Sequence, residues 1–180
     1  MYFIVLLKTT PCLYDSGKFF SLLWLIPMTD FSMRTIDLKN IDLIRNLWQR
    51  LNADHAALSP HFRDHFLSMT FEKRTKEFQA KAARGEVRIV ICSGEKADDV
   101  VGYCVSNIID GVGEIDSLYV EEDLRGSGVG SRLAQAAIDW MRLRHVEKIT
   151  VCVSVGNERA LAFYGRLGLL PRLFLLTNKQ

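Results

Sequence analysis

Residues 116–141 read DSLYVEEDLRGSGVGSRLAQAAIDWM. The apolar and partly β-branched residues that lead to Val120 predict a buried strand. Three glycines follow within five positions, and apolar residues then recur at helical spacing from Leu133 to Met141. A glycine-rich turn that opens a helix presents unpaired backbone N–H groups at the positive end of the helix dipole, and this geometry binds phosphate. The stretch therefore predicts a strand–turn–helix unit that holds a phosphorylated ligand.

The spacing of these glycines does not fit two common phosphate-binding motifs. A P-loop places a lysine directly after its last glycine, but Ser131 and Arg132 follow Gly130 here. A dinucleotide fingerprint, Gly-x-Gly-x-x-Gly, would need its third glycine at position 131 or 133, where the chain has Ser131 and Leu133. Because both motifs fail in register, a nucleotide-binding module is disfavoured.

The pattern that fits is Arg-x-x-Gly-x-Gly, filled by Arg125, Gly128 and Gly130. It resembles the acetyl-coenzyme A (acetyl-CoA) motif of the GNAT superfamily of N-acetyltransferases. A second segment, NERALAFYGRLGL at 157–169, resembles the family's Asn-x-x-Ala-x-x-Phe-Tyr-x-x-x-Gly pattern. The two motifs occur in the family's order, each after a predicted strand, and the resemblance covers roughly residues 33 to 176.

The resemblance implies a fold, a co-substrate and a set of binding residues. The fold would be α/β, with a mixed, mostly antiparallel central sheet flanked by helices. The co-substrate would be acetyl-CoA, with no metal. The strand end would pair with the pantetheine arm, the turn and helix start would hold the pyrophosphate, and an asparagine would contact the coenzyme arm; these residues are Leu118, Tyr119, Val120, Arg125, Gly126, Ser127, Gly128, Val129, Gly130, Ser131 and Asn157.

Acetyl transfer to an amine removes a proton from the amine and returns one to the departing thiolate. The resemblance implies that Tyr164 lies near the coenzyme sulfur and is the acid. It also implies that Glu114, four residues before Leu118, is the base, with Asp116 as its rival. Strict alternation would put both carboxylates on one face with Leu118, although the family's bulge at this point would shift that register.

Composition bounds the partners and the compartment. Hydrophobic residues make up 48% and charged residues 24% of the 180-residue chain, and the net charge of +2 is too small to indicate nucleic acid as a partner. The four cysteines form no C-x-x-C pair, and Cys92, Cys104 and Cys152 lie in predicted strands. We therefore expect buried free thiols, a reducing compartment and a cytoplasmic location.

The chain divides into an extension of uncertain status at 1–32 and a single domain at 33–180. The apolar runs YFIVLL and FFSLLWLI are shorter than the ~20 residues of a membrane span, and no Ala-x-Ala cleavage site follows them. We expect an upstream extension and no membrane partner. His61 and His65 are four residues apart on a predicted helix, but no third metal ligand accompanies them.

Periodicity and turn residues predict the order of the elements. We expect strands at 32–36, 87–92, 100–109, 114–120, 148–155 and 173–176. Helices are expected after a cap at Asp37, after Ser59-Pro60, and at 71–84, 129–144 and 158–167. The middle strands form hairpins and the last ones are joined by crossovers, which agrees with the fold that the resemblance implies.

The expected partners are acetyl-CoA and an amine-bearing small molecule or protein, and the sequence leaves the acceptor and a homodimer open. The alternative is a GNAT-like module that binds an acyl-CoA without turnover. Tyr164 argues against that alternative, because a pure binder has no need of an acid at the sulfur.

Overall fold

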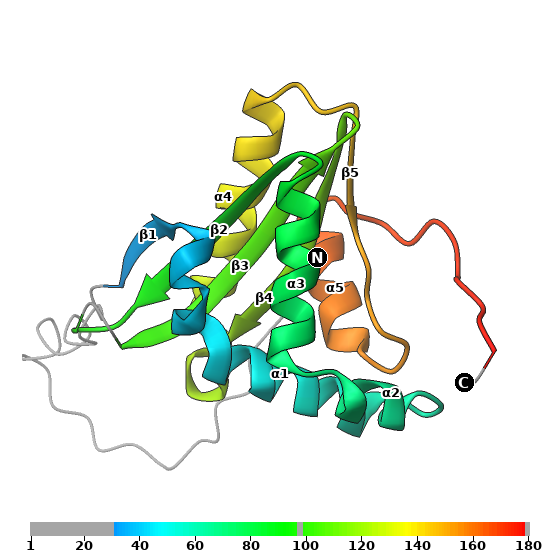
Figure 1. The fold of residues 1–180 in the computed structure, drawn as a ribbon. Coiled ribbons are helices and arrows are strands. Elements are labelled where there is room, and N and C mark those ends of the chain that lie inside the picture. Colours follow the sequence, from blue (N-terminus) through cyan, green and yellow to red (C-terminus); the bar gives the residue numbers. More distant parts are fainter. Residues whose placement is uncertain (1–30, 97–98, 179–180) are drawn as a thin grey trace, which may run out of the picture.

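A computed structural model describes residues 31–96 and 99–178. Its five-stranded sheet has the order β1-β2-β3-β4-β5 (Figure 1). The first four strands are antiparallel to their neighbours, and β5 runs parallel to β4. The strands are β1 (Ser32–Ile36), β2 (Glu86–Ser93), β3 (Val100–Ile109), β4 (Val112–Val120) and β5 (Lys148–Val151). The predicted fold class, a mixed and mostly antiparallel sheet flanked by helices, is confirmed.

Helices cover both faces of this sheet. The α-helices are α1 (Arg45–Leu58), α2 (Arg63–Ser68), α3 (Phe71–Ala82), α4 (Val129–Leu143) and α5 (Glu158–Arg166), and the 3₁₀ helices are η1 (Leu38–Ile44) and η2 (Glu122–Leu124). In Figure 1, α3 crosses the front of the sheet and α4 lies behind it. None of the helices in the described part of the chain has the length and hydropathy that a membrane span requires.

Two apolar clusters form the core, one on each face. The side chains of Ile89 and Ile91 in β2 pack with α1 and α3, whereas those of Val90 and Cys92 pack with α4. This alternation follows from the two-residue period of a strand, because both faces of β2 are covered by helices. The sheet is therefore fixed from both sides, and β4 is held at a defined position between α3 and α4.

The structure corrects four local predictions. Asp37 precedes η1, but its side chain makes no cap hydrogen bond. The second helix begins at Arg63, after the turn that follows Pro60. β5 ends at Val151, earlier than expected. No strand forms at 173–176, where the chain leads away from the sheet and the four apolar side chains are 77–90% exposed (Figure 1). Apolar composition alone does not make a strand, because a strand also needs a ladder partner.

Two irregularities of β4 shape the region that follows. The register between β3 and β4 shifts between Val105 and Ser106, so that Asp116 is an extra residue on β4. As a result Asp116 and Ser117 both point to the α3 face, whereas Leu118 packs on the α4 side. Strict alternation therefore does not hold here, and the bulge that the family resemblance implies is confirmed.

The second irregularity is that β4 and β5 separate. Their parallel pairing covers only Val112–Ile115 of β4. Beyond Ile115, the described residues pair with β4 only from the β3 side. Arg74 and Arg125 donate to the Asp116 and Val120 carbonyls, and the other groups on the open side of β4 are available to an extended ligand, as at any unpaired sheet edge.

Candidate active site

The glycine-rich turn lies at the end of this open edge. Gly126 and Gly128 have φ angles of 91° and 92°, in the region that glycine adopts without strain. Gly128 is the N-cap of α4, and no side chain of the described residues caps this helix. The first N–H groups of α4 therefore have no partner within the helix and lie at the positive end of its dipole. The local geometry agrees with the predicted phosphate site at 126–131.

The side chains of this turn hold its shape. The Ser127 hydroxyl donates to the Leu124 carbonyl at 2.6 Å. The Arg125 guanidinium donates to the Val120 carbonyl at 3.2 Å and to Asp54 at 2.9 Å, and it lies over the Tyr119 ring. The guanidinium therefore ties the turn to α1. Arg125 is part of the turn as predicted, but its charge is directed to Asp54.

A cavity of about 80 Å³ lies where β4 and the chain after β5 separate. We call it the β4–β5 pocket, and it has room for only a few non-hydrogen atoms. Its walls come from α1, β4, the segment after β5 and α5; they are Leu51, His55, Ile115, Asp116, Ser117, Leu118, Val151, Cys152, Val153, Ser154, Asn157, Ala160 and Tyr164. The pocket thus joins the strand that leads to the first motif with residues of the second motif, since Leu118 lies on one wall and Tyr164 on another.

Tyr164 is buried in α5, with its ring 4.9 Å from that of Phe163 in an edge-on arrangement. Burial raises the pKa of the Tyr164 phenol above its ordinary value. The hydroxyl therefore stays protonated and can donate a hydrogen bond into the pocket. Asn157 caps α5, since its side-chain oxygen accepts from the Ala160 N–H at 3.1 Å. Both of these predicted site residues lie in the pocket walls.

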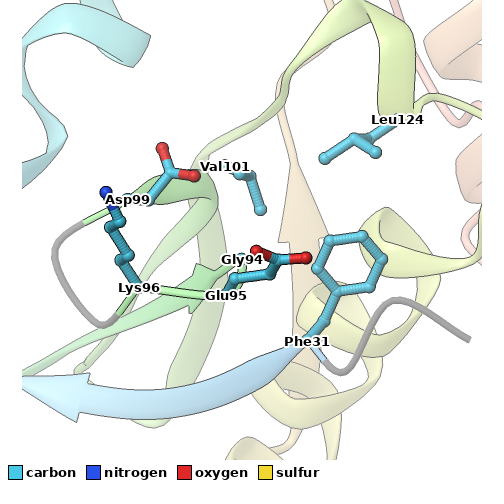
Figure 2. Close-up of a pocket in the computed structure, with 7 residues that line it drawn as sticks. All are labelled: Phe31, Gly94, Glu95, Lys96, Asp99, Val101 and Leu124. Carbon is cyan, nitrogen blue, oxygen red and sulfur yellow. The ribbon is translucent and has the colours of Figure 1, made fainter.

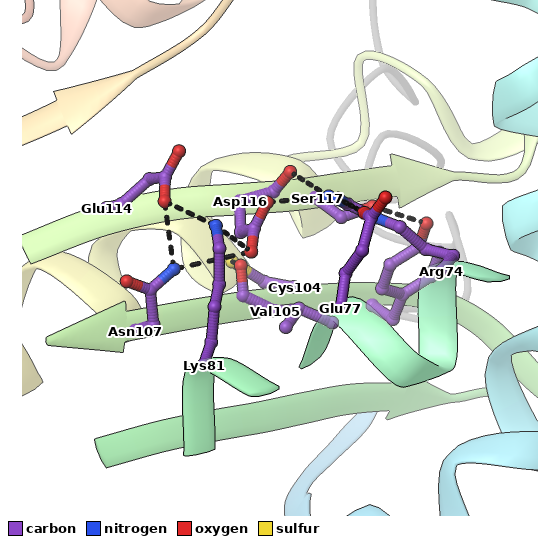
Figure 3. Close-up of polar contacts among 10 residues, drawn as sticks. Arg74, Glu77, Lys81, Cys104, Val105, Asn107, Glu114, Asp116 and Ser117 are labelled. Atoms are coloured by element: carbon purple, nitrogen blue, oxygen red, sulfur yellow. Dashed lines mark hydrogen bonds and ion pairs between the residues drawn. The ribbon is translucent and has the colours of Figure 1, made fainter. Parts of the chain in front are cut away.

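The carboxylates of β4 belong to a separate group of polar side chains, drawn in Figure 3. We call this group the α3 network; its members are Arg74, Glu77, Lys81, Asn107, Glu114 and Asp116. The Lys81 ammonium lies 2.7 Å from both Glu114 and Asp116. The Arg74 guanidinium lies 2.6 Å from Asp116. The network lies between α3 and the sheet, and each of its three carboxylates is paired with one or both of its two cations.

The two candidate bases therefore have different surroundings. Asp116 faces the pocket, but its side chain is only 5% exposed and is shared between two cations. Glu114 is 27% exposed, pairs with Lys81 and accepts from the Asn107 amide at 3.0 Å, and it is not among the pocket residues. Burial lowers the pKa of Lys81, but hydrogen bonds to Asp116 and Glu114 outweigh that effect and raise it. Lys81 thus stays charged and bound to both carboxylates.

Two residues of the pocket were missed or misjudged from the sequence. Cys92 and Cys104 are buried as expected, but Cys152 is exposed, because β5 ends one residue before it. His55, on α1, lines the pocket and was not among the predicted site residues. A signal for it exists, since His55 lies four residues after Leu51 on the apolar face of α1.

A larger cavity, of about 680 Å³, lies elsewhere and shares no residue with the β4–β5 pocket. Figure 2 shows it beside the turn between β2 and β3, with Glu95, Lys96, Asp99 and Phe31 around it. Its two carboxylates outnumber its one cation, which does not suit a pyrophosphate. Size alone therefore does not identify the site. Among the described residues, no cluster of three or more metal-ligating side chains occurs.

The comparison with protein families agrees with this geometry. The model of the acetyltransferase (GNAT) family matches residues 49–169, which is more than half of the chain. The chain therefore belongs to the GNAT family, a family of acyltransferase enzymes that use acetyl-CoA. The family that the two sequence motifs resemble is confirmed.

Individual relatives match over shorter stretches. N-alpha-acetyltransferase 30 of Schizosaccharomyces pombe is 39% identical over 56 residues, which are 31% of this chain and 37% of that protein. N-alpha-acetyltransferase MAK3 of Arabidopsis thaliana is 36% identical over 77 residues, which are 38% of this chain and 40% of that protein. The chain thus matches less than half the length of these two relatives.

Solved structures extend the likeness to nearly the whole domain. An aminoglycoside N-acetyltransferase in complex with CoA superposes with a TM-score of 0.59 at 15% identity, over 83% of this chain and 94% of that chain. At this identity the superposition shows the fold and not the acceptor.

Proposed function

We propose that this chain is an N-acetyltransferase that moves the acetyl group of acetyl-CoA to a primary amine by direct attack. The observation that carries the proposal is the arrangement of three features in one line. The open edge of β4 leads to the glycine turn at one end and borders the pocket of Tyr164 at the other. An elongated thioester with a pyrophosphate at its far end fits such a line.

The coenzyme would occupy the open edge and the turn. The backbone of Leu118, Tyr119 and Val120 would pair with the pantetheine arm, because these residues pair only with β3 among the described residues. The N–H groups from Gly128 to Ser131, at the start of α4, would receive the pyrophosphate, and Gly126 and Ser127 would shape the turn. Asn157 would contact the arm while it caps α5. The acetyl group would then reach the β4–β5 pocket.

The chemistry in the pocket follows from these positions. The amine lone pair attacks the thioester carbonyl carbon, and a β4 backbone N–H stabilises the oxygen as it gains charge. The carbon–sulfur bond then breaks, and Tyr164 donates to the departing thiolate. Because burial raises the pKa of Tyr164, the phenol stabilises the sulfur chiefly as a hydrogen-bond donor. The base predicted at Glu114 would act from outside the pocket walls, through an intervening group.

We propose α-amines, such as the N-terminus of a peptide, as the acceptor class. Two of the matched relatives are N-alpha-acetyltransferases by name. Deprotonation at pH 7 costs about 1 kcal/mol for an α-amine and roughly 4.6 kcal/mol for a lysine-like amine. The weaker demand suits a pocket whose only carboxylate is already paired with Arg74 and Lys81. The free thiols Cys92 and Cys104 support the cytoplasm as the compartment.

A binding assay and a turnover assay test this function. A thermal shift should show stabilisation by acetyl-CoA and none by ATP or NAD, since a ligand at 100 times its Kd adds about 2.7 kcal/mol. Release of the CoA thiol should follow when peptides with a free N-terminus are added. Peptides with a blocked N-terminus and one lysine are the matched control. Binding without thiol release would establish the non-catalytic alternative, and no shift would overturn the coenzyme assignment.

A further inference from the structure

His55 is the group of interest, and its position is set by the α1 helix. It lies in the last turn of α1, one wall of the β4–β5 pocket that Tyr164 also lines. Its ring packs against that of Phe66 at 5.2 Å between centroids. The outer side of Phe66 contacts the exposed His65 at 5.6 Å. Phe66 thus supports the His55 ring from the side of α2.

The imidazole of His55 is free to accept a proton. Among the described residues, none makes a hydrogen bond or an ion pair with its ring nitrogens. A neutral imidazole has one bare nitrogen, which can accept a proton. The other pocket side chains that could titrate are Asp116, which is held by two cations, Cys152 and Tyr164.

The charges around His55 come from its own helix, from α3 and from β4, while α2, which also packs against it, adds the exposed His65 behind Phe66. Asp54 precedes it on α1, Arg74 approaches from α3, and Asp116 faces the same pocket from β4. Asp116 is neutralised by Arg74 and Lys81, so its charge contributes little beyond the α3 network. The pocket thus holds one unpaired proton acceptor and one protonated phenol.

We propose that His55 is the general base that takes the proton from the acceptor amine. The inference rests on the proposed acetyl transfer, and it replaces Glu114 in that role. Two observations support it. His55 and Tyr164 line one pocket, and both carboxylates of β4 are bound by Lys81. A base and an acid that line the same pocket from two different helices are what amine attack on a thioester in that pocket requires.

The proton balance of the step is complete. The acceptor arrives as an ammonium ion at pH 7 and first loses one proton to His55. Its nitrogen then forms a bond to the acetyl carbon and loses a second proton, which replaces the one that Tyr164 gives to the sulfur. The carbon–sulfur bond breaks, and the thiolate gains one proton by way of Tyr164. His55 then releases its proton to solvent, and Tyr164 regains one. The products are the amide and the free thiol of CoA, with no oxidant, metal or covalent enzyme intermediate.

The electrostatics of His55 suit this role near neutral pH. Burial lowers the pKa of His55 below 6.5, and Arg74 acts in the same direction against the opposing charge of Asp54. His55 is therefore neutral at pH 7 and ready to accept a proton. Protonation of His55 removes the base. We therefore expect kcat/KM to fall as the pH is lowered below 6.5, and this acidic limb of the pH–rate profile to reflect the titration of His55.

His55→Gln tests the proposal, because glutamine keeps a polar side chain of similar reach but accepts no proton. With a peptide α-amine as the acceptor, we expect kcat to fall about 100-fold at pH 7 while acetyl-CoA affinity is retained. The loss should shrink at pH 9, where the amine is already deprotonated in solution. The limb below pH 6.5 should disappear. His65→Gln, on the outer side of Phe66, is the matched control and should behave as wild type.

The outcomes separate the base from the overall function. Turnover by wild type with an equal rate and pH profile in His55→Gln would overturn only the role of His55. If Glu114→Gln instead lost turnover at pH 7 and recovered it at pH 9, the base would be Glu114. A loss in His55→Gln that pH does not recover would indicate a packing role. Absence of turnover in wild type would contradict the proposed function itself.

Discussion

The α3 network and the β4–β5 pocket meet at Asp116 but differ in how their polar groups are satisfied. In the network every charged group has an opposite partner within 2.7 Å. In the pocket, His55 and Tyr164 have no such partner among the described residues. Matched charges hold a helix on a sheet, whereas unmatched donors and acceptors remain available for a substrate. A position on β4 is therefore not sufficient to make a carboxylate a catalytic base, because its neighbours decide whether it is available.

The largest expected effect is on acetyl-CoA affinity, from a substitution in the glycine-rich turn before α4. Gly128→Glu should abolish acetyl-CoA binding, because a carboxylate would lie at the proposed pyrophosphate site. Nothing lies within 4 Å of an added Cβ at this position, so the substitution strains the backbone at a φ of 92° but meets no clash, and the fold should survive. Gly111→Glu is the matched control, since Gly111 also has a positive φ and open surroundings but lies in the β3–β4 hairpin. Acetyl-CoA affinity near that of wild type in Gly128→Glu would refute the phosphate site.

The next effect is on the network and concerns stability. Asp116→Ala should lower the free energy of unfolding by about 3 kcal/mol, because it removes a buried partner of Arg74 and Lys81. Denaturant unfolding measures the loss. Asp139→Ala, which removes an exposed 3.7 Å pair with Arg142 and an exposed hydrogen bond from Gln135, should change stability by less than about 0.5 kcal/mol. Equal losses in the two variants would mean that the network is no more stabilising than a surface pair.

In the pocket the effect should be on rate. Tyr164→Phe keeps the ring packed against Phe163 and removes only the hydroxyl. We expect kcat to fall about 100-fold, with acetyl-CoA affinity nearly unchanged, because the hydroxyl acts on the departing sulfur. Steady-state kinetics and a binding isotherm test this. A variant with wild-type kcat would reduce Tyr164 to a packing residue.

A smaller effect should separate Glu114 from the pocket. Glu114→Gln keeps the shape and leaves Asp116 as a partner for Lys81, so the stability loss should be about 1 kcal/mol. Turnover should fall less than tenfold, and raising the pH should not recover it. Denaturant unfolding and a pH series of kcat provide the two measurements. A large loss of turnover that is recovered at high pH would mean that Glu114 of the α3 network takes part in catalysis together with the pocket residues.

The smallest effect is the pH dependence of stability that His55 contributes. Because the folded-state pKa of His55 is lowered from 6.5, the unfolded state binds more protons in mild acid. This contribution to stability is present above pH 6.5 and is lost as the pH falls through the folded-state pKa. His55→Gln should therefore lose less stability than wild type between pH 7 and pH 5. Parallel curves for the two proteins would show that His55 is solvated like an ordinary histidine.

Much of the fold could be read from the sequence, because its signals are local. Three glycines within five positions and a run of apolar residues at helical spacing predicted the turn and α4. In the structure, two of these glycines have φ near 90°. The second motif placed Asn157 directly before a helix that carries Tyr164, and in the structure Asn157 caps α5 and Tyr164 is its buried residue. The predicted strand at 173–176 was wrong, since a ladder partner is not a local property. Cys152 was judged buried because β5 was expected to continue past Val151.

The sequence by itself determined the family, the glycine-rich turn and the order of the elements up to α5, since each depends on residues close together in the chain. Only the tertiary structure decided which polar groups are matched. Lys81 of α3 reaches Glu114 and Asp116 across more than thirty residues of sequence. His55 and Tyr164, from helices far apart in the chain, share one pocket. Charge matching and desolvation depend on distances in space, which spacing along the chain does not record.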